Sequence, residues 1–170
     1  MVETFYQTFG QVSFTLLGLW MAVAGARYDR WAPSPAHRRM AYGVFLQFAL
    51  PAVMSVFTLV APDEPVVWHV TFAVAAGLGV VGMLLLRAAD DPRVGRSGLL
   101  SAANTAAAAV YAVVAVVALV PSDVLGDALG VDPLRLEAGL LTLLVFLGVN
   151  VGWLLFDDAP RPSDRAAGPF

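Results

Sequence analysis

The chain contains no cysteine, no lysine and no isoleucine, and charged residues make up only 14% of its 170 residues. The absence of cysteine excludes disulfides, thiolate metal sites and a cysteine nucleophile. Because all ten basic residues are arginines and the net charge is -3, the chain lacks the polybasic segments that bind nucleic acid. We therefore expect no nucleic-acid partner.

The missing isoleucine is accompanied by abundant alanine, valine, glycine, arginine and proline. This bias is typical of proteins encoded in GC-rich bacterial genomes. The chain is also 59% hydrophobic, with a mean hydropathy of +0.75, far from the balance of a soluble protein. The composition predicts a multi-pass protein of the bacterial inner (plasma) membrane, in contact with the lipid bilayer.

Five segments are long and apolar enough to cross a bilayer, which takes a helix of about 20 residues. They span about residues 5–26, 40–61, 66–86, 98–120 and 134–156. The connections are short, so residues 1–156 form one domain. Residues 157–170 are acidic and proline-rich, which predicts a short mobile tail. The predicted fold class is an all-α integral membrane protein, a single bundle of five transmembrane helices.

The arginines are distributed unevenly between the two ends of these spans. Nine of the ten lie in the first connection, the third connection and the tail, and only Arg135 lies at the other end. The second and fourth connections are acidic instead. The positive-inside rule then places the N-terminus outside and the C-terminus in the cytoplasm.

The polar residues of the first span share one helical face at spacings of three and four. This face consists of Thr4, Thr8, Gln11 and Thr15 in the outer half, and it continues as Gly18, Ala22 and Gly25 in the inner half.

Polar groups also mark the later spans. Further candidates for a polar path are Gln47, Pro51 and Ser55 on the second span, Asn104 and Tyr111 on the fourth, and Asn150 on the fifth. Pro51 removes the hydrogen bond to the carbonyl of Gln47 and predicts a kink there. At 1.5 Å per residue, the three amides fall in one layer, on the order of 4 to 8 Å to the cytoplasmic side of the midplane. Gly77 and the Gly148-x-x-x-Gly152 pair predict close helix packing.

These polar groups have two interpretations. Small residues and side-chain amides hold transmembrane helices together, which is the usual role of any one such residue. Polar residues in membranes also line water-filled paths. The Gln11 and Thr15 face is the best candidate for this second role.

Missing groups narrow the function further. We place Glu3 and Glu137 at the outer ends of their spans, so that no carboxylate lies deep in a helix and proton-driven transport is disfavoured. The two histidines, His37 and His69, lie at opposite membrane surfaces, which disfavours haem ligation. No motif of a hydrolase, metalloprotease or nucleotide-binding loop is present. We expect no enzymatic activity, no metal and no cofactor.

The sequence therefore favours a homo-oligomeric membrane protein that forms or lines a passive path for ions or small solutes. A five-helix subunit is small for enclosing a pore, so the path requires a symmetric assembly with the first-span face turned to its axis. The alternative is a non-catalytic accessory or assembly subunit of a larger membrane complex, in which the polar faces are packing surfaces.

Overall fold

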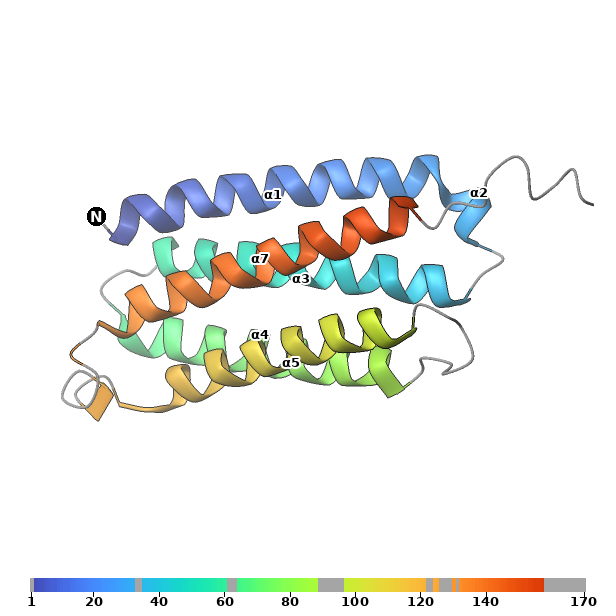
Figure 1. Cartoon of the computed structure of the whole chain (residues 1–170). Coiled ribbons are helices and arrows are strands. Elements are labelled where there is room, and N and C mark those ends of the chain that lie inside the picture. Colours follow the sequence, from blue (N-terminus) through green and yellow to red (C-terminus); the bar gives the residue numbers. More distant parts are fainter. Residues whose placement is uncertain are drawn as a thin grey trace, which may run out of the picture.

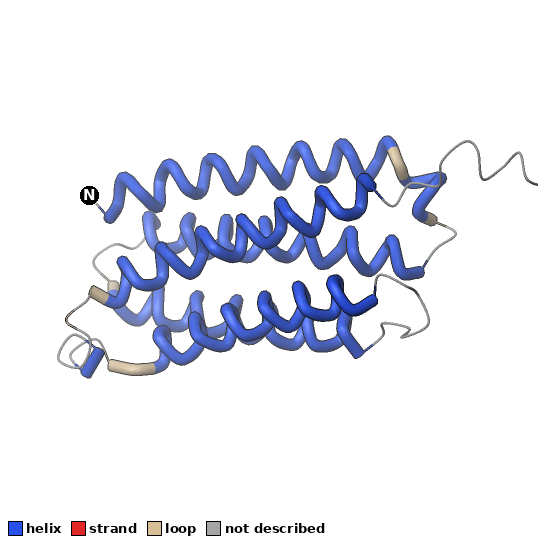
Figure 2. Tube along the Cα trace, viewed as in Figure 1, coloured by secondary structure: helices blue, strands red, loops and turns tan. Residues whose placement is uncertain are grey.

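A computed structural model describes residues 2–32, 35–60, 64–88, 97–121, 124–125, 130 and 132–157. The described chain forms five long helices, and a one-turn helix, α2 (Tyr28–Trp31), follows the first of them (Figure 1). The long helices are α1 (Val2–Ala26), α3 (Pro35–Val60), α4 (Pro65–Ala88), α5 (Ser97–Leu119) and α7 (Pro133–Asp157). The described residues contain no strand (Figure 2). The prediction of an all-α bundle of five helices is confirmed.

The length of the helices follows from the apolar runs. The long helices have 23 to 26 residues, roughly 35 to 39 Å at 1.5 Å per residue, which exceeds the hydrocarbon thickness of a bilayer. All five are long and apolar enough to span a membrane, and the chain is a multi-pass membrane protein. The orientation of its termini stays a prediction, and the predicted tail lies outside the described residues apart from Asp157.

Proline and aspartate define where helices begin. Pro35, Pro65 and Pro133 each occupy a first helical position, where the missing N–H of proline costs no hydrogen bond. At α7 the carboxylate of Asp132 accepts a hydrogen bond from the N–H of Leu134 at 3.0 Å. This side-chain cap satisfies one of the free amide groups of the first turn.

Helix α3 lies at the centre of the bundle and packs against α1, α4 and α7. The α4 and α5 helices form a closely packed pair, and α5 also packs on α7. Helix α1 lies at the edge of the bundle, opposite the α4 and α5 pair (Figure 1), and packs mainly on α3. We call the end where α1 begins the outer end, after the predicted orientation.

The α4 helix can lie close to its neighbours because of two glycines. A Cβ atom at Gly79 would lie 2.5 Å from the ring of Tyr111, and one at Gly82 would lie 2.7 Å from Leu46. The Tyr111 ring therefore crosses α4 at Gly79, and its hydroxyl donates a hydrogen bond to the carbonyl of Leu46 at 3.1 Å. A Cβ at Gly77 would meet open space, so within this chain the close approach falls at Gly79 and not at the expected Gly77.

We expect Gly79→Ala to lower the free energy of unfolding by about 1 to 3 kcal/mol, because the new methyl group would displace a fully buried ring. Gly77→Ala is the matched control on the same helix. It should leave stability unchanged or raise it by about 0.5 to 1 kcal/mol, since alanine favours helix and nothing obstructs it. Both values come from unfolding in the same lipid or detergent. Equal destabilisation by the two variants would contradict the packing at Gly79.

Candidate functional site

The polar face of α1 points away from the bundle. Thr4, Thr8, Gln11 and Thr15 are all exposed, whereas the buried residues of α1 lie on the opposite side of the helix. We call these four residues the outward polar face. The Thr15 hydroxyl donates to the carbonyl of Gln11 at 2.8 Å. Among the described residues, the side-chain amide of Gln11 has no hydrogen-bond partner.

Four contacts fix the rotation of α1. Near the outer end the Tyr6 hydroxyl donates to the carbonyl of Leu134 at 2.9 Å. In the inner half the indole N–H of Trp20 donates to the carbonyl of Ala41 at 3.0 Å. Gly10 lies against Ser55, and Gly152 lies against the Trp20 ring, with would-be Cβ distances of 3.3 and 3.4 Å. Since Tyr6, Gly10 and Trp20 all point inward, the Gln11 face points outward.

The surroundings of the outward polar face resemble a helix-packing surface. In the inner half the face continues as Gly18, Ala22 and Gly25, which are exposed, and both glycines have open space at their Cβ positions. Large apolar side chains flank the line on both sides: Val12, Phe14, Leu19 and Met21. Small residues between large ones allow another helix to approach closely.

The polar residues of α3 face the opposite way, into the core. Gln47, Pro51 and Ser55 are all buried. The Ser55 hydroxyl donates to the carbonyl of Pro51 at 2.8 Å, so its hydrogen-bond partner lies within its own helix. Gln47 is only 1% exposed. Its Nε2 atom lies 3.9 Å from the sulfur of Met83, and its Oε1 atom has no partner among the described residues.

The three amides do not converge on one site. Asn104 and Gln47 are buried, but Asn150 is exposed and donates to the carbonyl of Phe146 on its own helix at 2.7 Å. Asn150 lines a shallow groove of about 480 Å³ between α5 and α7. Gly148 lies against Gln47, with a would-be Cβ at 3.0 Å. Gln47 thus lies between α3, α4 and α7 of one chain.

Glu137 lies near the outer end of its helix, as expected, in the second turn of α7. This residue is 0% exposed, and among the described residues neither carboxyl oxygen has a hydrogen-bond partner. Its position near a helix end was expected, whereas its burial among the helices was not, and the expectation against proton-driven transport stays a prediction. The spacing of apolar residues could have predicted this burial. Glu137 begins a buried line at alternating spacings of four and three: Glu137, Leu141, Leu144, Gly148, Val151 and Leu155.

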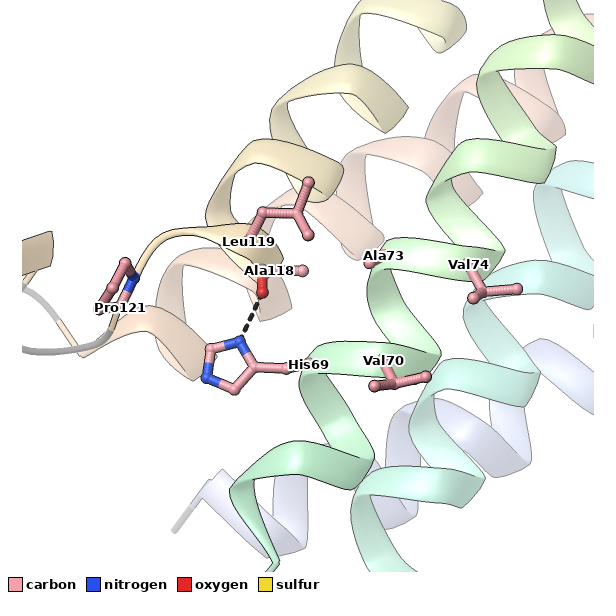
Figure 3. A pocket seen from close by; sticks show the side chains of 7 residues that line it. All are labelled: His69, Val70, Ala73, Val74, Ala118, Leu119 and Pro121. Atoms are coloured by element: carbon pink, nitrogen blue, oxygen red, sulfur yellow. Dashed lines mark hydrogen bonds between the residues drawn. The ribbon is translucent and has the colours of Figure 1, made fainter.

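A second groove opens between α4 and α5 near the outer end. Its volume is about 530 Å³, and its lining is apolar apart from His69. The His69 ring points from α4 to the end of α5, where its Nδ1 atom donates to the carbonyl of Ala118 (Figure 3). This carbonyl belongs to the last turn of α5, and the carbonyls of a last turn have no N–H partner within their own helix. His69 therefore caps a helix end.

The described residues contain no group of three or more His, Cys, Asp or Glu side chains that could hold a metal ion. The polar groups of the described helices are neutral hydroxyls and amides, which can form hydrogen bonds, and one buried carboxyl group.

We expect Gln47→Leu to leave the free energy of unfolding within about 1 kcal/mol of the unsubstituted protein or to raise it, because leucine removes an unpaired buried oxygen at similar volume. Tyr111→Phe is the comparison, since it removes a hydroxyl bonded to Leu46, and it should lower stability by about 1 kcal/mol. Unfolding of both variants in one detergent gives the two values. A larger loss for Gln47→Leu than for Tyr111→Phe would show that the Gln47 amide has a stabilising partner.

The comparisons with known proteins add no relative. No family model matches the chain, and neither the curated proteins nor the solved structures contain a significant match. The functional argument therefore depends on the geometry of the chain itself.

Proposed function

We propose that the protein is a homo-oligomer of the bacterial inner membrane whose copies meet around the outward polar face of α1, and that this face lines a passive path for ions or small solutes. One observation carries the proposal: Thr4, Thr8, Gln11 and Thr15 are exposed on the side of α1 that faces away from its own bundle. In hydrocarbon, the Gln11 amide and the Thr4 and Thr8 hydroxyls need hydrogen-bond partners from water or from another protein surface. The Thr15 hydroxyl already donates to the carbonyl of Gln11.

The interior of a subunit favours a path between copies. Met54, Met83 and Tyr111 fill the middle of the bundle, and all three are fully buried. The polar groups of α3 lie among these side chains and contact their own subunit. Exposed polar side chains on the other helices, such as Asn150 on α7, donate to their own helix. Among the described residues, the row of four on α1 is therefore the polar surface best placed to meet solutes.

Symmetry favours a second copy of the same chain as the partner. Copies inserted in the same orientation place each residue opposite its own equivalent at the same depth around an axis normal to the membrane. A glutamine amide carries both a donor and an acceptor, as does a threonine hydroxyl, so Gln11 and Thr15 can pair with themselves. Gly18 and Ala22 allow the helices to come close in the inner half.

The chemistry of the face favours small neutral solutes or monovalent ions. Its three hydroxyls and one amide carry no charge, whereas paths for divalent cations use rings of carboxylates. The one acidic residue of α1 is Glu3, in the first turn. The proposed role is non-catalytic and requires no cofactor.

An accessory subunit is the second candidate. The same exposed face would then meet a helix of a different membrane protein, and Gln11 would pair with that helix and not with water. The line of Gly18, Ala22 and Gly25 favours close helix contact over hydration in the inner half. Two experiments separate these roles.

The first experiment uses the absence of cysteine. Single Gln11→Cys and Thr15→Cys variants should form disulfide-linked dimers when membranes are oxidised, because each residue faces its own equivalent in a symmetric assembly. Leu78→Cys on α4 and Phe146→Cys on α7 are matched controls, since these side chains are 60% and 61% exposed on other faces. The controls should stay monomeric on denaturing gels. Cross-linking at the controls alone, or at none of the four positions, contradicts a homo-oligomer around α1.

The second experiment tests conduction. Vesicles that contain the protein should pass small ions or neutral solutes at least several-fold faster than empty vesicles. A membrane-impermeant thiol reagent should block that flux in Gln11→Cys and leave Leu78→Cys unaffected. An assembly that cross-links through Gln11 but conducts no tested solute would favour a structural or accessory role. A monomer without flux contradicts the proposal entirely.

A further inference from the structure

Glu137 is a carboxylic acid enclosed by the bundle. It lies in the second turn of α7, one turn after Leu134, whose carbonyl accepts a hydrogen bond from the Tyr6 hydroxyl. The side chain is fully buried, and both oxygens are shielded from solvent without a hydrogen-bond partner among the described residues. The Tyr6 hydroxyl, which is bonded to the Leu134 carbonyl, therefore lies about one helical turn from Glu137.

The other charged and titratable groups at this end do not compensate the carboxyl group. On α7 and before it, Arg135 and Asp132 are exposed, as is Glu3 on α1. Glu64 before α4 is exposed, and His69 on α4 donates to Ala118 of α5. The described outer half of α3 carries no titratable side chain, and that of α5 carries only Tyr111, whose hydroxyl donates to the carbonyl of Leu46. No cation within the described residues pairs with Glu137.

A buried carboxylate without hydrogen bonds is very unfavourable, and it is tolerated only with a cationic partner or a proton. The described residues supply no cation, and no three acidic or histidine side chains gather there to hold a metal ion. A proton needs no cavity and no further ligands. It is the ligand that fits a carboxyl group packed among apolar side chains.

We propose that Glu137 is a proton-binding site at the outer end of the bundle, occupied when α1 lies against α7. The carboxylate takes one proton from the adjacent aqueous phase and becomes a neutral acid, with no other bond formed or broken. Loss of that proton places a charge beside the contact between Tyr6 and Leu134, and so favours separation of α1 from α7 at this end. This site is independent of the proposed path, because it lies on the inward side of α1.

The first test is infrared spectroscopy of the protein in lipid bilayers near neutral pH. The unsubstituted protein should show the carbonyl band of a protonated carboxylic acid, and the band should shift in heavy water. Glu137→Gln should lack this band, whereas Glu3→Gln and Glu64→Gln should retain it, because those two side chains are exposed. A spectrum without the band in the unsubstituted protein, or a band that persists in Glu137→Gln, would overturn the proposal.

The second test measures stability against pH and does not depend on any transport assay. A group that holds its proton only in the folded state makes folding less favourable as the pH rises. Relative to Glu137→Gln, the folding equilibrium constant of the unsubstituted protein should fall by up to about tenfold per pH unit as the pH rises above the ordinary glutamate pKa of about 4.3, for as long as the folded protein keeps the proton. Glutamine has nearly the size of the protonated acid and should fold. Parallel pH profiles for the two proteins would contradict proton binding at Glu137, and if the glutamine variant fails to fold, the heavy-water shift in the unsubstituted protein decides.

Discussion

Hydrocarbon supplies no hydrogen-bond partners, and this constraint requires every polar side chain in the five helices to find a partner in the protein or in water. Ser55, Thr15 and Asn150 meet it locally, because each donates to a carbonyl one turn earlier on its own helix. Tyr111, Tyr6 and Trp20 meet it between helices, and their bonds to Leu46, Leu134 and Ala41 also fix how those helices are rotated. The groups that meet it in neither way include the buried Oε1 of Gln47 and Oγ of Ser13, the Gln11 amide and the Glu137 carboxyl, and the last two carry the functional proposals.

Two such groups stand out for opposite reasons. The Gln11 amide lies on the surface of the subunit, where another copy and water can reach it. The Glu137 carboxyl lies inside, where neither can, so a proton is its simplest partner. Tyr6 connects the two, since it is on the inward side of α1 and bonds to α7 one turn from Glu137. The outer half of α1 thus has the proposed assembly surface on one side and the proposed proton-binding contact on the other.

The sequence predicted the five-helix architecture because runs of more than 20 apolar residues have few alternatives. It also grouped Gln47, Pro51 and Ser55 on one face, and the structure buries all three. It could not tell which side of α1 points inward, because Tyr6 and Ser13 make the buried side polar as well. That rotation follows from tertiary contacts, such as Gly10 against Ser55 and Trp20 against Gly152. The burial of Glu137 was not predicted, because its nearness to the helix start does not show that it shares a face with the buried Leu141 and Leu144.

The central claim is that the outward polar face of α1 meets other copies around a hydrated axis. A structure determined in a lipid bilayer tests it most directly, since it reports the number of subunits and the surroundings of Gln11 together. The account predicts a symmetric oligomer with Thr4, Thr8, Gln11 and Thr15 turned to the axis and in contact with water. A single subunit with Gln11 facing lipid, or an oligomer formed through α4 and α5 with α1 at its periphery, would contradict it.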